Sequence, residues 1–154
     1  MSADHIEPLR SLAAHARRER DAAMARLVQA QLAHRTALAQ GEQLATYRDE
    51  YKQRWSTRFT QGTSTLVLQC YQGFAGRLEQ AIAHQTHAVR QAELREQQAR
   101  AALVRLEQRA AAVDKLIERR LAEQGQKHRR VEQHASDESA GRRHAARRSA
   151  ESTL

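Results

Sequence analysis

The chain has 154 residues and carries 26 Lys and Arg side chains against 18 Asp and Glu, which gives a formal net charge of +8. Only 4% of its residues are aromatic, and it contains one proline and six glycines. Sheet folds need Val- and Ile-rich strands separated by turn residues, and both are scarce here, so we exclude a β-sandwich and a parallel α/β sheet. The Ala-, Leu-, Gln-, Arg- and Glu-rich composition predicts an all-α protein made of long helices or a coiled coil.

The cysteine content and the lengths of the apolar runs indicate the cellular compartment of the protein. Cys70 is the single cysteine, so the chain has no internal disulfide and no cysteine-based zinc site, and we expect a reducing environment. Asp4 and Glu7 lie where a signal peptide would need apolar residues. The longest apolar run, 66–68, is far shorter than the ~20 residues that cross a bilayer. We therefore expect a cytoplasmic protein.

A first long helix is predicted from about residue 5 to about residue 59. Asp4 and Glu7 form a capping pattern, and Pro8 lies in the first turn, where its missing N–H costs little. One stripe of this helix is mostly apolar, and its apolar members are Leu9, Leu12, Ala16, Ala23, Leu27, Ala30, Ala37, Leu44, Tyr51 and Trp55. Its polar interruptions are Arg20, His34 and Arg48.

A turn is predicted over 60–64, the one cluster of turn-forming residues before the C-terminal region. Gly62 can adopt a positive φ angle, and Thr63 or Ser64 can cap the helix that follows. A short connection between two long helices predicts an antiparallel hairpin.

A second helix is predicted from about residue 65 to about residue 135. In steps of three and four residues from Leu68 to Ile117, every position is apolar except Gln85 and Glu96. This heptad pattern predicts a left-handed coiled-coil seam.

The two predicted helices have unequal lengths. At 1.5 Å per residue, the end of the second helix overshoots the first by roughly 20–30 Å. Residues 136–154 are rich in Ser, Ala and Arg, and we expect them to fray or to be disordered without a partner. The whole chain, 1–154, is interpreted as a single elongated coiled-coil unit.

The six aromatic side chains gather in one stretch of the sequence: Tyr47, Tyr51, Trp55, Phe59, Tyr71 and Phe74. The first four are spaced by four residues and form one drifting helical stripe, which the hairpin brings to the turn end. Two interpretations stay open. The aromatics seal the end of the coiled coil, or they form a docking face for another protein, and both can hold for different members.

The charged residues and histidines give weaker indications. Mixed charges at helical spacing are typical of a solvated coiled-coil face. The overhanging segment is basic and could meet an acidic protein or nucleic acid, but no aromatic side chain is interleaved for base stacking, so we do not expect nucleic-acid binding. His84 and His87 share a helix face without a third ligand, which favours a surface pair over a metal site.

We also expect no enzymatic activity, cofactor, metal or small-molecule substrate, because the sequence holds no phosphate loop, nucleophile–base pair or carboxylate pair in a recognisable motif.

Both predicted helices carry motifs with a fixed order and spacing. The first reads Leu44-x-x-Tyr47-Arg48-x-x-Tyr51, then, after the turn, Phe74-x-x-x-Leu78-x-x-Ala81-Ile82-x-x-Gln85-x-x-x-Val89. The later ones read Lys115-Leu116-x-x-Arg119-Arg120 and Glu132-Gln133-x-x-x-Asp137-Glu138-x-Ala140. Together these motifs resemble the FliJ family of flagellar export proteins, the later ones its C-terminal helix, and the resemblance covers roughly residues 9–142.

The resemblance implies an antiparallel two-helix coiled coil with a longer second helix, similar to the central stalk of rotary ATPases and not itself an enzyme. It implies a cytoplasmic part of the flagellar type III export apparatus, at the inner face of the cell membrane and contacting the membrane only through that apparatus, with a role in motility and chemotaxis. The implied partners are the export ATPase FliI, the export gate FlhA, FliH and export chaperones. Alternatives are the stalk protein of a virulence type III secretion system, a basic coiled-coil nucleic-acid-binding protein and a homo-oligomeric rod.

The resemblance also implies two sets of contact residues. The family's gate-contacting face falls here on Gln40, Leu44, Tyr47, Tyr51, Phe74, Leu78, Ala81 and Gln85. Gln85 departs from the pattern, since some relatives carry His at this place. The residues that would face the ATPase are Arg17, Arg18, Arg119 and Arg120.

Overall fold

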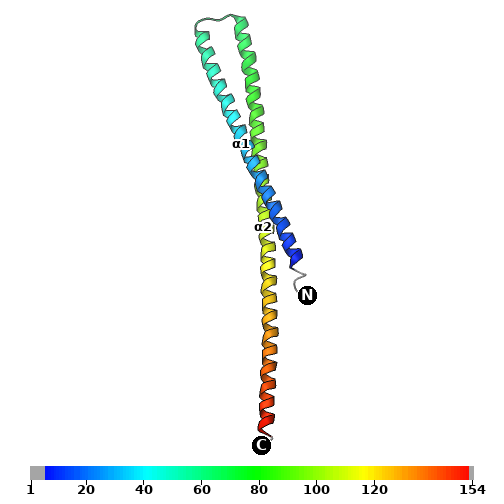
Figure 1. Cartoon of the computed structure of the whole chain (residues 1–154). Helices are drawn as coiled ribbons and strands as arrows, with labels where there is room; N and C mark the ends of the chain where they lie inside the picture. Colours follow the sequence, from blue (N-terminus) through cyan, green and yellow to red (C-terminus); the bar gives the residue numbers. More distant parts are fainter. Residues whose placement is uncertain (1–5, 153–154) are drawn as a thin grey trace. The chain divides into compact units, whose positions relative to one another are not determined.

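The computed structural model describes residues 6–152, which form two long helices joined by a short turn (Figure 1). Helix α1 spans Glu7–Thr60 and helix α2 spans Thr65–Glu151. This confirms the all-α helical hairpin that the composition and heptad pattern predict. The predicted start of the first helix near residue 5 and its cap at Asp4 lie outside the described residues.

The chain divides into two compact units, which are described separately. The turn unit is Glu19–Glu107, and the terminal unit combines Met1–Arg18 with Gln108–Leu154. Each unit contains part of α1 and part of α2. Within the described residues, no helix is long and apolar enough to span a membrane.

The connection between the helices follows the predicted chemistry. Gly62 has a φ of 89°, a value that side-chain-bearing residues rarely adopt, and its N–H donates to the carbonyl of Phe59 at 3.3 Å. Ser64 caps α2, because its Oγ accepts from the N–H of Val67 at 3.4 Å. Thr63 instead donates its hydroxyl to the carbonyl of Arg58 at 3.4 Å. The side chain that caps α2 is therefore that of Ser64.

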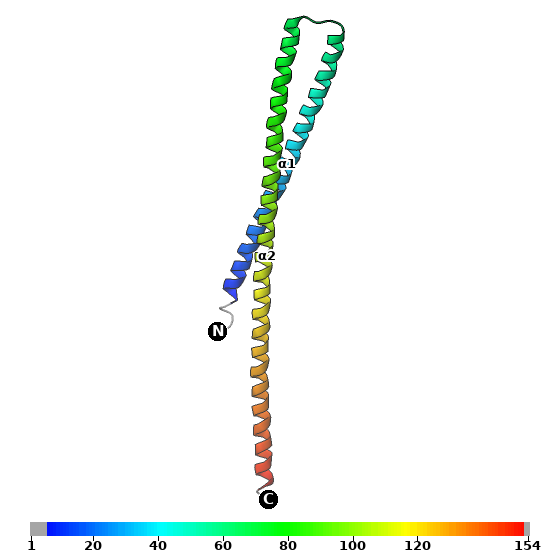
Figure 2. The same ribbon diagram turned by 180° about the vertical axis from the view of Figure 1, so that it is seen from behind.

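In the turn unit, the two helices run antiparallel from the turn and pack along a heptad seam (Figures 1 and 2). Ala23 and Ala92 are buried on the two sides of this seam, together with Leu78 and Leu103. Alanine at seam positions lets the helix axes approach closely, while each alanine removes little apolar area from water. The α2 positions predicted from the heptad pattern within this unit are all buried or half-buried, except Leu68 beside the turn.

In the terminal unit, the start of α1 packs on the middle of α2. Ala13, Ala16, Ala110 and Val113 are buried there. Leu12, a member of the apolar stripe predicted for the first helix, is 39% exposed, because the 3,4 spacing places the adjacent Ala13 in the seam.

The C-terminal part of α2 extends well past the predicted end near residue 135, and that expectation is wrong. The helix ends at Glu151, although every described residue from 126 onward is exposed (Figure 1, orange to red). This stretch contains no proline and is rich in the helix formers Ala, Arg, Glu and Gln. Pairs one turn apart add local support, as where Arg142 Nη2 lies 3.3 Å from Glu138 Oε2. Helical order in 136–151 replaces the expected fraying or disorder.

Candidate functional site

Five aromatic side chains close the turn end of the hairpin. Tyr51 lies at the centre, with its ring centroid 4.7 Å from that of Phe74 and 5.4 Å from that of Tyr71. On the other side of Tyr71, the rings of Phe59 and Trp55 lie 5.1 and 5.6 Å away. All five side chains are half-buried. Offset and edge-on ring contacts of this kind hold the helix ends together beyond the effect of buried area.

Tyr47 extends this cluster onto the surface. Its ring meets Phe74 edge-on at 6.3 Å, yet its side chain remains 45% exposed. A shallow hollow beside it is lined by Gln40, Gln43, Leu44, Tyr47 and Gln85. The cluster thus combines both sequence interpretations, since its centre seals the hairpin and its edge presents an aromatic ring beside a depression.

Gln85 is fixed by hydrogen bonds across the hairpin. Its Nε2 donates to the carbonyl of Ala37 at 2.8 Å and lies 3.4 Å from Oε1 of Gln40. A half-buried amide needs such partners, since burying an unpaired polar group is costly. The floor of the hollow is therefore a positioned amide.

The predicted gate-contacting residues fall into three groups by exposure. Gln40, Tyr47 and Ala81 are exposed, and Leu78 is 7% exposed within the seam. The half-buried members are Leu44, Tyr51, Phe74 and Gln85. Leu78 therefore supports the face from beneath. The hollow also includes Gln43, which the sequence analysis missed, although its position three residues after Gln40 places it on the same helix face.

A polar contact interrupts the apolar seam at the middle of the turn unit. His34 Nδ1 lies 2.7 Å from Glu96 Oε2, and Arg100 Nη2 donates to Glu96 Oε1 at 3.0 Å. The hydrogen bond with His34, assisted by that from Arg100, lowers the pKa of Glu96 below its ordinary value of 4.5. In the sequence, His34 and Glu96 are separate polar interruptions of two apolar stripes, and the antiparallel register makes them partners.

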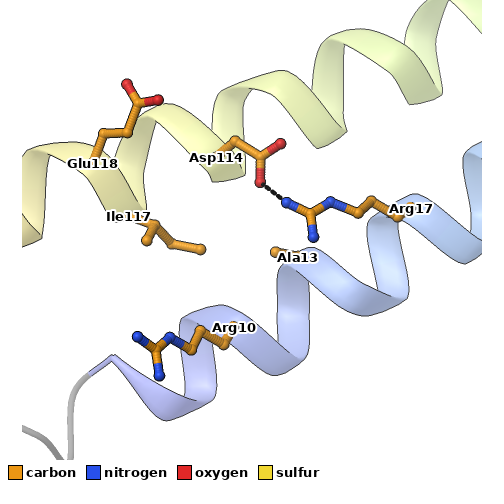
Figure 3. Close-up of a pocket in the computed structure, with 6 residues that line it drawn as sticks. All are labelled: Arg10, Ala13, Arg17, Asp114, Ile117 and Glu118. Atoms are coloured by element: carbon orange, nitrogen blue, oxygen red, sulfur yellow. Dashed lines mark hydrogen bonds and ion pairs between the residues drawn. The ribbon is translucent and has the colours of Figure 1, made fainter.

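The terminal unit carries a second surface feature, an open groove between the two helices. It is lined by Arg10, Ala13, Arg17, Asp114, Ile117 and Glu118 (Figure 3). Arg17 Nη2 lies 2.7 Å from Asp114 Oδ1 across the groove. The groove thus has an apolar floor of Ala13 and Ile117 with charged side chains of both signs around it.

The predicted ATPase-facing arginines all lie in the terminal unit and are exposed. Arg17 is committed to Asp114, whereas Arg18, Arg119 and Arg120 have exposed guanidinium groups on the same unit. Because an exposed pair such as Arg17–Asp114 is weak in water, Arg17 can exchange its partner at little cost.

Metal-ligating residue types are dispersed over the part of the chain that the structure describes. No group of three or more His, Cys, Asp or Glu side chains there is arranged to hold a metal ion. His84, His87 and Cys70 are all exposed.

These features define an antiparallel helical hairpin of the coiled-coil class, with an aromatic face at its turn end and an exposed, basic C-terminal helix. A family model described as "Flagellar FliJ protein" matches residues 5–149, and the chain belongs to this family. No curated protein and no solved structure matches the chain. Membership indicates a role connected with flagellar protein export.

Proposed function

We propose that this protein is a non-enzymatic, stalk-like coupling factor of the flagellar export apparatus. In this proposal, it links the export ATPase FliI to the export gate FlhA and assists export chaperones. It works in the cytoplasm against the inner face of the cell membrane, and its loss impairs motility and chemotaxis through failed flagellar assembly. The family match favours this system over a virulence type III system.

The observation that carries the proposal is the exposed edge of the aromatic cluster. Tyr47 stands beside a hollow whose floor is an amide held by two hydrogen bonds, and Ala81 leaves room on the opposing helix. Aromatic side chains at the edge of a preorganised hollow are typical of protein-binding surfaces. We assign FlhA to this face because the family's gate-contacting pattern falls on it.

The terminal unit is the proposed contact for FliI, with FliH recruited alongside the ATPase. Its part of α2 carries the exposed pair Arg119 and Arg120, and its start of α1 carries Arg17 and Arg18. Exposed arginines can form bidentate pairs with carboxylates of another protein. Over residues 126–151, α2 is exposed on every side, so this part can enter a ring of subunits without first breaking contacts of its own.

The gate contact is tested by a pull-down of FlhA with the double variant Tyr47→Ala/Ala81→Arg. Both positions are exposed, so the fold should be retained, while the variant loses the ring and places a charge beside the hollow. We expect binding to fall by at least about tenfold, as for the removal of a central interface residue.

The matched control is Ala83→Arg, which adds the same charge at an exposed alanine of α2 two residues away, on the opposite side of that helix. It should bind FlhA as the unaltered protein does. Unchanged FlhA binding by a folded Tyr47→Ala/Ala81→Arg variant contradicts the proposed gate face.

A further inference from the structure

The turn unit has two lateral flanks, one on each side of its seam, and interhelical contacts identify both. On one flank, Lys52 Nζ lies 3.4 Å from Glu79 Oε1. On the other, the rings of Tyr47 and Phe74 meet at 6.3 Å. In an antiparallel coiled coil, the positions beside the seam face their counterparts on the other helix, so these two contacts fix the heptad position of every residue in the unit.

Charges are divided unequally between these flanks. Most carboxylates of the turn unit occupy the Lys52–Glu79 side, which we call the acidic flank: Asp21, Glu42, Asp49, Glu79, Glu93 and Glu107. The opposite side, from Ala22 to Tyr47 on α1 and from Phe74 to Arg105 on α2, is called the basic flank. Its charged members are Arg26, Arg77, Arg95 and Arg105, and the two carboxylates on this side of the turn unit, Glu19 and Glu50, lie at its two ends on α1.

The four arginines of the basic flank are exposed, and the structure shows no ion pair for them among the described residues. Glu50, which lies on this side just beyond the aromatic end of the flank, pairs with Arg54 at 3.8 Å. The basic flank therefore keeps a net positive charge, which Glu19 at its end offsets only in part.

Small side chains occupy the centre of the basic flank. Ala33 on α1 and Ala81, Ala88 and Ala102 on α2 stand beside the seam, and Gln40 is the largest neutral residue among them. These short side chains, contributed by both helices along one flank, form a strip of low side-chain bulk, which we call the alanine furrow. A third helix can place a row of apolar side chains into such a furrow while its backbone stays at helix-packing distance.

We propose that the basic flank of the turn unit binds an acidic amphipathic helix of a partner protein as a third strand beside the hairpin. The apolar stripe of that helix lies in the alanine furrow, and its flanking carboxylates pair with the four arginines. The basic flank shares Gln40, Tyr47, Phe74 and Ala81 with the face assigned to FlhA. Its four arginines and Ala33, Ala88 and Ala102 lie outside that face, so the proposal stands without the gate contact.

Two other occupants fit the flank less well. A nucleic acid needs a dense array of cations for its phosphates, and here neutral Ala and Gln side chains separate the arginines. A second copy could offer its acidic flank, but such a contact joins unlike surfaces and builds a ring or a filament of copies, not a closed pair. A helix from another protein gives a finite complex.

The test measures the binding of two labelled synthetic helices by fluorescence anisotropy with the full chain. Each probe is about four heptads long with leucine at its seam positions, and the flanking positions are Glu in one probe and Lys in the other. We expect the Glu probe to bind at least about tenfold more tightly than the Lys probe, and its affinity to fall when salt rises, because the Debye length shortens.

Matched charge reversals locate the site. The variant Arg26→Glu/Arg95→Glu should weaken binding of the Glu probe by at least about tenfold. The control Arg35→Glu/Arg90→Glu makes the same charge change with exposed arginines of the same two helices on the acidic flank, and it should leave the affinity within about twofold. Circular dichroism checks that each variant is helical.

A third variant separates furrow docking from attraction of any polyanion. Ala33→Arg fills the furrow and adds positive charge, so it should weaken binding of the Glu probe while strengthening binding of duplex DNA. The proposal is overturned by equal binding of the two probes, by no binding of the Glu probe, by equal effects of the two double reversals, or by tighter binding of the Glu probe to Ala33→Arg. Reduced FlhA binding by Tyr47→Ala/Ala81→Arg alongside any of these results would leave the proposed function standing.

Discussion

Glu96 shows how one polar residue in an apolar seam specifies the pairing of two helices. Its two carboxylate oxygens serve different partners, His34 on the opposite helix and Arg100 one turn along its own. The neighbouring seam positions on α2 are filled by Ala92 and Ala99, which would pack almost equally well one heptad away. A shifted register would leave the carboxylate without its cross-helix partner, so the pair disfavours slippage.

The lowered pKa of Glu96 predicts a dependence of stability on pH. Its folded-state pKa lies below the unfolded value of 4.5, so the stabilisation is complete above that value and is lost as pH falls through the folded pKa. Glu96→Gln removes this titration. We expect the difference in unfolding free energy between the unaltered protein and Glu96→Gln to shrink as the pH drops from about 6 to about 3, measured by urea unfolding.

A suitable control is Glu93→Gln, which removes an exposed carboxylate on the acidic flank. Its unfolding free energy should stay parallel to that of the unaltered protein over the same range. If Glu96→Gln also stays parallel, the contact with His34 does not stabilise the folded state in solution.

At the level of single residues, the sequence predicts which side chains gather at one end of the hairpin, but not which individual side chains form hydrogen bonds across it. The spacing by four residues predicts that Tyr47, Tyr51, Trp55 and Phe59 gather at one end. It also explains their unequal exposure, because a step of four exceeds the mean seam step of 3.5 and rotates each ring toward the next flank. The bond from Gln85 to the Ala37 carbonyl could not be predicted, since it depends on the axial offset of the two helices.

At the level of elements, replacing a glycine by alanine is predicted to change stability in opposite directions at Gly62 and at Gly76. Gly62 holds a φ of 89° at the turn, and a side chain there is strained although no atom lies within 4 Å. Gly76 lies inside α2, where a Cβ would meet nothing within 4 Å. Gly76→Ala should therefore raise the unfolding free energy by about 0.5–1 kcal/mol, while Gly62→Ala should lower it by about 1 kcal/mol.

Thermal or urea unfolding of the two variants side by side measures these changes. A loss of stability in Gly76→Ala would mean that this part of α2 is not a regular helix. An unchanged stability in Gly62→Ala would mean that the turn does not need its left-handed conformation.

The ends of a helix can be predicted from the sequence only where turn-forming or capping residues mark them. The turn has Gly62 and Ser64, and its predicted position is accurate to about one residue. The C-terminal boundary was placed near residue 135 because large apolar residues become sparse there. Loss of apolar residues ends a packed seam and does not by itself end a helix, so α2 continues to Glu151 on local propensity and side-chain pairs.

At the level of the whole molecule, pairing of α1 with α2 inside one chain predicts a monomer. The seam is already occupied by the chain's own second helix, including the polar contact of His34 with Glu96. Light scattering on the purified chain should give a mass near 17.5 kDa. A stable dimer whose dissociation parallels unfolding would instead favour the homo-oligomeric rod, in which the seam forms between chains.

The unequal charge of the two flanks has a consequence before any contact is made. The acidic flank carries six carboxylates against Arg35, Lys52, Arg90 and Arg100, whereas the basic flank carries four arginines, so the turn unit has an electric dipole moment across the helix axes. A charged body that comes within a Debye length exerts a torque on such a dipole and turns the arginine side toward negative potential. The orientation of encounter is then biased while the two molecules are still separated by water, and added salt weakens that bias.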